Sequence, residues 1–289
     1  AAPFLGITSP ATPHQPRPRN MQENTLIGHY RITSPLGKGG MGEVYLAEDT
    51  DLKRQVALKV LPESVRDDPD RLARFRREAT AAAQVNHPNI AQIYSIEEAD
   101  GPEGTSILLI VMEYVDGVSL KDVIPTDGMD VGGSNGTGRG VLKYVPTLSF
   151  YDVFIPLSDG LAHAHENHIT HRDLKPGNIM IREDGVPKIL DFGLARITSP
   201  SQPPAEVDTQ APTRTMDEDE KLAPIEPLTD KPQFMGTPQY MSPEQASLKE
   251  LDHRTDLFSF GIIMYEALAG QRPFQGNSQP EIVSSILKD

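Results

Sequence analysis

His-Arg-Asp-Leu-Lys-Pro-Gly-Asn occupies residues 171–178, and Asp-Phe-Gly follows at residues 191–193. Phosphoryl transfer from a nucleotide needs a carboxylate that orients the attacking hydroxyl, hard oxygen ligands for Mg²⁺, and cations that neutralise the developing charge. Asp173 can supply the first, Asn178 and Asp191 the second, and Lys175 together with Lys59 the third. We therefore predict that these residues, far apart in the chain, converge on the triphosphate of one nucleotide.

A glycine-rich stretch lies upstream, at residues 36–44. Its motif G-x-G-x-x-G also occurs in dinucleotide-binding folds, but there a helix must follow the glycines. Here residues 44–47 are Val-Tyr-Leu-Ala, which favour a strand, so we predict a hairpin that folds over phosphates. An ordinary glycine-rich turn is the alternative. The residues expected at the nucleotide are Leu36, Gly37, Lys38, Gly39, Gly40, Met41 and Gly42.

Lys59 ends a second strand-like run, Val-Ala-Leu at residues 56–58. Such a lysine is usually a solvated strand end, but after the glycine hairpin it can reach phosphate oxygens. It then needs a counter-charge, for which Glu78 is the candidate, and a surface glutamate is the alternative interpretation of that residue. Glu78 falls on a predicted helix with Asp68 as its N-cap and Pro69 at its first position. The apolar face of this helix consists of Leu72, Phe75, Ala79 and Ala82.

Strand-like runs dominate the first part of the chain, and helical periodicity dominates from about residue 148. The first helix of the second part carries Pro156 inside its apolar stripe, so it either kinks there or begins near residue 155. Residues two apart on a helix do not share a face, which favours ordinary packing over a zinc site for a nearby histidine group. That group consists of His163, His165, His168 and His171.

Composition limits the classes of function. The chain has 289 residues, 41 Asp and Glu against 27 Lys and Arg, and a net charge of −14. Such acidity disfavours binding to nucleic acid, and the absence of cysteine excludes disulfides and thiol nucleophiles. No apolar run approaches the roughly 20 residues of a membrane span. We expect a cytoplasmic protein, or the cytosolic part of a longer membrane-anchored one.

Three segments lack the pattern of a packed core. Residues 1–27 are proline-rich and are predicted to be disordered, and a glycine-rich insertion covers about 125–140. A second insertion, at about 198–232, is acidic, since residues 201–230 hold eight acids and two bases. This tract has three interpretations: a disordered insert that keeps the loop soluble, an autoregulatory segment phosphorylated on its threonines, or a docking tract for basic partners.

Taken together, the glycine hairpin, Lys59 and the two motifs after residue 170 resemble those of a bacterial Hanks-type serine/threonine protein kinase. The resemblance implies an α+β, two-lobed protein-kinase fold, with a small antiparallel β-sheet lobe at residues 28–117 and a larger, mainly helical lobe at residues 118–289. It also implies an enzyme that uses ATP and Mg²⁺ to phosphorylate Ser and Thr hydroxyls of protein substrates. Self-association, with autophosphorylation in the long activation segment, is a further expectation.

Several residues of the nucleotide site take their roles from the resemblance alone. Met112 would lie at the back of the adenine pocket, and the backbones of Glu113 and Val115 would bond the adenine edge. Lys175 marks specificity for Ser and Thr over Tyr. The residues that would enclose the adenine are Val44, Ala57 and Met180.

The end of the chain carries three more implied roles. Thr237 would position the substrate hydroxyl, and Asp256 would support the backbone of the catalytic loop. Glu244, in a Ser-Pro-Glu triplet where Ala-Pro-Glu is commoner, would pair with an arginine from a later helix. The chain stops at Asp289, so we expect a truncated helical lobe in which Glu244 lacks that partner. A nucleotide-binding scaffold without catalysis and a regulatory fragment are the rival interpretations.

Overall fold

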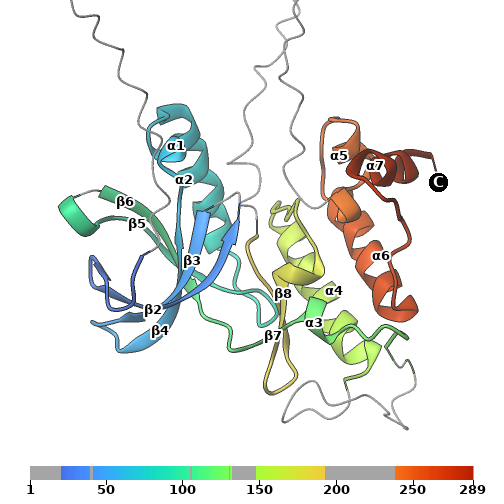
Figure 1. Cartoon of the computed structure of the whole chain (residues 1–289), viewed down its shortest axis with the longest axis horizontal. Helices are drawn as coiled ribbons and strands as arrows, with labels where there is room; N and C mark the ends of the chain where they lie inside the picture. The colour runs from blue at the N-terminus through green and yellow to red at the C-terminus, as the bar shows by residue number, and fades with distance from the viewer. Residues whose placement is uncertain are drawn as a thin grey trace, which may run out of the picture.

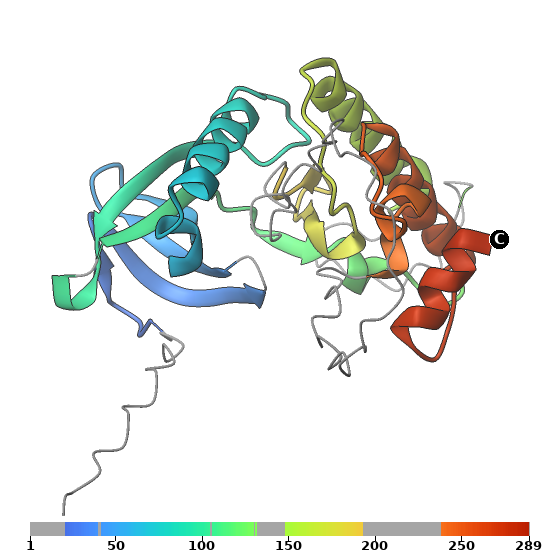
Figure 2. The ribbon, with the colours of Figure 1, turned by 90° about the horizontal axis from the view of Figure 1, so that it is seen from above.

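A computed structural model describes residues 21–39, 42–104, 106–129, 131, 148–192 and 238–288. Most of the proline-rich start, most of the first insertion, the whole of the second insertion, and Gly40, Met41 and Thr237 lie outside these residues. Within them, Figures 1 and 2 show a sheet-rich lobe beside a lobe built mainly of helices. The expected two-lobed α+β architecture is confirmed.

The first lobe is built on an antiparallel sheet whose described strands have the order β1-β2-β3-β4-β6-β5. Strands β2 and β3 form the hairpin that carries the glycines, and their last pair is Gly39 with Gly42. The bounds are β1 Leu26–Ile27, β2 Tyr30–Gly39, β3 Gly42–Asp49, β4 Arg54–Val60, β5 Ile93–Asp100 and β6 Ser106–Glu113, with a 3-10 turn, η1, at Pro102–Gly104.

Helix α2 (Pro69–Ala83) packs against this sheet, beside the short helix α1 (Glu63–Arg66). The Asp68 side chain accepts hydrogen bonds from the backbone N–H groups of Asp70 and Arg71, so the predicted start of the helix is confirmed. The apolar face that the periodicity predicts forms a buried cluster with strands β4, β5 and β6. Burial of this face fixes the rotation of α2 and therefore the direction of Glu78.

The second lobe combines a small sheet with five helices in its described part. Helix α4 begins at Phe150, where Ser149 and Asp152 form a capping box, and it runs through Pro156 without a break. The helices are α3 Leu120–Val123, α4 Phe150–Glu166, α5 Pro243–Ala246, α6 Arg254–Ala269 and α7 Gln279–Lys288. The strands are β7 Gly117–Ser119, β8 Ile179–Arg182 and β9 Pro187–Ile189, and 3-10 turns lie at Pro176–Asn178 (η2) and Pro238–Tyr240 (η4).

The two lobes meet at two places. The chain crosses between them at residues 114–116, between β6 and β7. A second contact joins the segment after α2 to β9, where Ala91 N–H donates to the carbonyl oxygen of Ile189 and Ile189 N–H donates to Asn89. Among the helices described, none has both the length and the apolar character needed to cross a membrane. Lys59, on β4, and Asp191, after β9, form an ion pair across this junction.

Candidate active site

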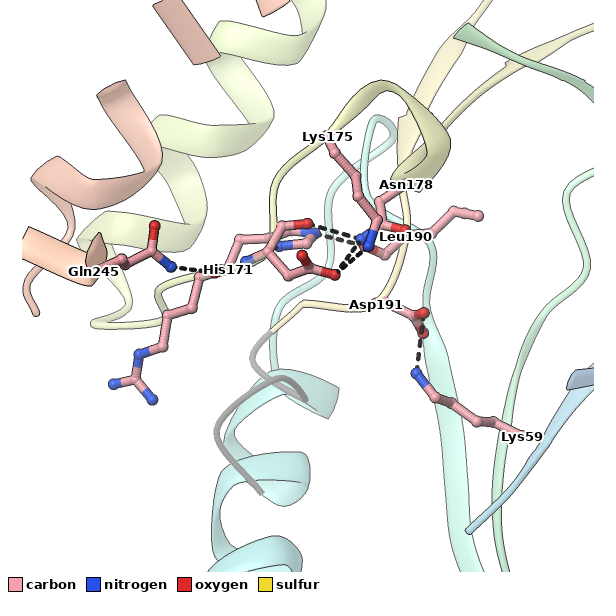
Figure 3. A network of polar contacts seen from close by, with 9 residues as sticks. Lys59, His171, Lys175, Asn178, Leu190, Asp191 and Gln245 are labelled. Carbon is pink, nitrogen blue, oxygen red and sulfur yellow. Dashed lines mark hydrogen bonds and ion pairs between the residues drawn. The ribbon is translucent and has the colours of Figure 1, made fainter. Parts of the chain in front are cut away.

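Residues 171–178, which we call the catalytic loop after their expected role, lie between α4 and β8. Two of the side chains labelled in Figure 3, Lys175 and Asn178, contact Asp173. Lys175 Nζ lies 2.6 Å from Asp173 Oδ2. Asn178 Nδ2 donates to the carbonyl oxygen of Asp173 at 2.8 Å and lies 3.3 Å from Asp173 Oδ2. The turn η2 brings Asn178 back towards the start of the loop. The structure thus places three of the predicted phosphoryl-transfer residues in direct contact, with the Asp173 carboxylate partly exposed.

Asp256, on α6, holds the backbone of this loop. Its carboxylate is fully buried and accepts hydrogen bonds from the N–H groups of His171 and Arg172, both at 2.7 Å. His165 Nε2, on α4, lies 2.8 Å from the same carboxylate. Arg172 has a φ of 67°, a left-handed conformation that is unfavourable for a residue with a side chain. The contacts with Asp256 therefore stabilise a strained turn directly before Asp173.

Asp191 is tied to the catalytic loop through its neighbour Leu190. The Leu190 N–H donates to the carbonyl oxygen of Asn178 at 2.8 Å, and the Leu190 carbonyl oxygen accepts from His171 Nε2 at 2.8 Å. Asp191 itself has a φ of 58°, and its Oδ2 lies 3.0 Å from Lys59 Nζ. Because Lys59 belongs to β4 in the other lobe, this ion pair joins the two lobes at the site (Figure 3).

The partner of Lys59 differs from the one that the sequence suggested. Lys59 is almost completely buried and pairs with Asp191, whereas Glu78 was the expected counter-charge. Glu78 Oε2 is also buried and has no hydrogen-bond partner among the described residues. A buried ammonium group takes whichever carboxylate is close enough, and that choice depends on the distance between α2 and β4, which spacing along the chain does not reveal.

The glycine hairpin approaches β4 closely at Gly42. This residue has a φ of 116°, and a Cβ atom there would lie 2.0 Å from the carbonyl oxygen of Val60, so no other residue fits without a shift of the backbone. Lys38 Nζ lies 2.7 Å from Glu43 Oε1. Burial raises the pKa of the Glu43 carboxyl, but hydrogen bonds from Lys38 and Tyr45 outweigh it and the net pKa is lowered. The hairpin thus carries a lysine that an acidic neighbour holds in place.

The residues assigned to the adenine divide between the two lobes. Val44, Ala57 and Met112 lie on adjacent strands of the first sheet and pack in one cluster. Met180 lies on β8 of the second sheet, and Val115 is buried in the connection between the lobes. Leu36 lies on β2, close to the tip of the hairpin, and is exposed.

The Glu113 side chain makes a contact that sequence reasoning missed. It pairs with Lys188 on β9, with 2.9 Å between Lys188 Nζ and Glu113 Oε2, and the lysine is buried. No local signal marks this lysine, because most lysines in strands are exposed. The ion pair fixes the end of β6 at the point where the chain crosses between the lobes.

The donor chemistry of Asn178 and Asp191 fits Mg²⁺, which prefers carboxylate and amide oxygens. The histidine group has other contacts: His165 pairs with Asp256, His171 with Leu190, and His163 stacks on His87. No group of three or more His, Asp or Glu side chains in the described ranges has a geometry that could hold a metal ion. For His163, His165 and His171, the contacts with other residues agree with the packing interpretation.

Residues 30–289 match the family model described as "Protein kinase domain". The chain belongs to the protein kinase family. It is 38% identical over 264 residues to the serine/threonine-protein kinase PknB of Mycobacterium leprae, covering 91% of this chain and 36% of the relative. A probable serine/threonine-protein kinase PknB of Bifidobacterium longum is 38% identical over 87% of this chain and 31% of its own length. A probable serine/threonine-protein kinase of Streptomyces coelicolor is 38% identical over 91% and 33%.

The chain therefore spans about a third of the length of these relatives. Protein kinases as a family use ATP and Mg²⁺ and act on protein substrates. Of the other predicted residues, Glu244 is exposed on α5, and Thr237 lies outside the described residues.

Proposed function

We propose that this chain is the catalytic domain of a serine/threonine protein kinase, which transfers the γ-phosphate of ATP to Ser and Thr hydroxyls of protein substrates. One observation carries the proposal. Lys59 is far in sequence from Asp173, Lys175, Asn178 and Asp191, yet all five lie in one network of short contacts, in which Leu190 connects Asp191 to Asn178. The names of the relatives support the same activity.

In this proposal each charged group has one role. Asp173 would orient the attacking hydroxyl, and Lys175 would neutralise charge on the transferred phosphoryl group. Asn178 and Asp191 would hold Mg²⁺, which lowers the electrostatic cost of the phosphate charges. Lys59 would bind phosphate oxygens once it leaves Asp191.

The remaining assignments belong to the same proposal. The glycine hairpin would cover the phosphates, and Glu78 would hold Lys59 in the conformation that reacts. Thr237 would position the substrate. The residues proposed to enclose or bond the adenine are Val44, Ala57, Met112, Glu113, Val115 and Met180. Residues 28–117 and 118–289 are the proposed lobes, and the whole protein is proposed to be cytoplasmic or anchored to a membrane by a segment outside this chain.

Incorporation of label from γ-³²P-ATP with Mg²⁺ tests the activity. The wild type should incorporate label, whereas Asp173→Asn and Lys59→Met should incorporate none while keeping the far-ultraviolet circular dichroism of the wild type. Asp51→Asn is the matched control, because Asp51 is an exposed aspartate on the turn between β3 and β4. It should behave as the wild type.

Each other outcome contradicts part of the proposal. Label in Asp173→Asn at the wild-type rate would refute the role of that residue. ATP binding by the wild type without label would identify a scaffold, and neither binding nor label would identify a regulatory fragment. Mass-spectrometric mapping of phosphosites between Thr198 and Thr237 tests the proposed autophosphorylation, and its dependence on protein concentration tests self-association.

A further inference from the structure

The side-chain amide of Gln245 joins two segments that are 73 residues apart. Its Nε2 group donates a hydrogen bond of 2.7 Å to the carbonyl oxygen of Arg172, in the catalytic loop. Its Oε1 atom accepts a hydrogen bond of 2.9 Å from the N–H of Ser242, at the start of α5. The Ser242 hydroxyl accepts from the Gln245 N–H in return, which completes a capping box. One side chain thus caps α5 with its oxygen and holds the catalytic loop with its nitrogen, and the second contact is drawn in Figure 3.

The carbonyl group that Gln245 holds belongs to the peptide unit between Arg172 and Asp173. A peptide unit is planar, so fixing its carbonyl oxygen also fixes the direction of the Asp173 N–H. That N–H donates to His171 Nδ1 at 3.2 Å, and the N–H of Arg172 itself donates to Asp256. The plane directly before Asp173 is therefore held at both of its polar ends by side chains.

This support acts on a strained residue. Arg172 is in the left-handed region, which a residue with a side chain occupies only when its surroundings hold it there. Asp256 holds the Arg172 N–H, and Gln245 holds its carbonyl oxygen. Without the Gln245 contact, the peptide unit between Arg172 and Asp173 could rotate, and the Asp173 carboxylate would lose its fixed direction.

The segment that carries Gln245 is itself fixed to α6. The Ser242 hydroxyl lies 2.6 Å from the Thr255 hydroxyl, and Ser259 Oγ donates to the carbonyl oxygen of Tyr240 at 2.7 Å. These contacts are buried or partly buried. Gln245 therefore couples the position of a segment that is fixed to α6 to the loop that carries Asp173.

We propose that Gln245 is a positioning residue for Asp173, acting through the carbonyl group of Arg172. The proposal rests on the proposed kinase function, because it assigns Asp173 a role in the reaction. The sequence does not predict this role, because a glutamine at the third position of a helix indicates only a capping residue.

Gln245→Glu removes the contact made by the amide nitrogen and keeps the contact made by the amide oxygen. Glutamate has the same shape and keeps an oxygen for the Ser242 N–H, as in an ordinary capping box, but it has no N–H for the Arg172 carbonyl. We expect kcat for a peptide substrate to fall about tenfold or more, because small displacements of a reacting group are costly. The KM for ATP should change by less than about twofold, and the melting temperature should stay within about 3 °C of the wild type.

Gln245→Lys is the complementary variant. Lysine keeps a donor for Arg172 but loses the acceptor for Ser242, so it should retain more of kcat than Gln245→Glu while melting at a lower temperature. A fall in kcat that follows the melting temperature across both variants would assign Gln245 a merely structural role and overturn the proposal.

Hydrogen–deuterium exchange tests the contact without any turnover. In the nucleotide-free protein, a peptide spanning residues 168–176 should exchange faster in Gln245→Glu than in the wild type, because amides that Asp256 and His171 protect would open more often. Unchanged exchange together with unchanged kcat would refute the proposal. A wild type that incorporates no phosphate would contradict the proposed function instead, and the exchange rates would then decide alone whether Gln245 positions the loop.

Discussion

Asp256→Ala removes a carboxylate that is completely buried under the catalytic loop. Among the described residues, its donors are the N–H groups of His171 and Arg172 and the Nε2 atom of His165. Each buried donor that loses its partner costs about 1–3 kcal/mol, so three of them amount to about 3–9 kcal/mol before the loop relaxes. Water that enters the space of the carboxylate recovers part of this cost. We expect a loss of about 3–5 kcal/mol, a large share of the 5–15 kcal/mol that stabilise a typical domain.

Asp256→Asn should have a smaller effect of about 2 kcal/mol, because it keeps the volume and one acceptor oxygen but turns an NH₂ group towards a donor. Urea unfolding followed by circular dichroism measures both changes, since the chain has no tryptophan for fluorescence. With a slope of about 3 kcal/mol per M, a loss of about 3 kcal/mol lowers the midpoint by about 1 M.

Asp252→Asn is the control for the removal of a negative charge next to the same helix. Asp252 is exposed and pairs with Arg254 at the start of α6, so its replacement should not shift the urea midpoint measurably. Equal midpoints for Asp256→Ala and Asp252→Asn would show that the buried carboxylate contributes nothing, and the account of the loop would be wrong.

Three further predictions concern other parts of the site. Glu78→Gln should keep or raise the melting temperature, because a buried carboxylate oxygen without a partner is costly, but it should lower kinase activity. Melting and activity are measured in parallel, and a fall in both would contradict the prediction. Gly42→Ala should weaken ATP binding in calorimetry, whereas Gly261→Ala on α6, where a Cβ atom meets open space, should not, and equal affinities would contradict the close approach. Burial, and next the hydrogen bond to Glu266, raise the pKa of Tyr240, so its stabilising effect is complete below about pH 10 and is lost as the pH rises towards the pKa of the folded state. Tyr240→Phe should therefore lose less stability than the wild type between about pH 9 and about pH 11 in urea unfolding, and an equal loss would refute this assignment.

Local signals predicted the fold well where one side chain acts on its own backbone. Asp68 and Pro69 mark the start of α2 correctly, because an N-cap and a proline at the first position act within one turn. Pro156 left two possibilities for α4, and the pair Ser149 and Asp152 could have decided between them, since a capping box at this spacing starts a helix before the proline.

Long-range choices could not be predicted in the same way. The sequence indicates that Lys59 needs a carboxylate, but the choice of Asp191 over Glu78 depends on how the lobes and α2 are placed. The contact of Gln245 with Arg172 has the same origin, because it depends on the packing of α5 beside a loop 73 residues away. Such contacts depend on the tertiary structure, and no periodicity in the sequence predicts them.

The ion pair between Lys59 and Asp191 should couple the binding of the nucleotide to the binding of the metal ion. Each group is proposed to meet a different part of the nucleotide complex, one the phosphates and the other the metal ion. A phosphate anion alone would leave Asp191 without its cation, and a divalent cation alone would leave Lys59 without its anion. When the phosphate anion and the divalent cation bind together, both Lys59 and Asp191 gain a new partner of opposite charge. Each ligand should therefore increase the affinity for the other, by the same factor in both directions.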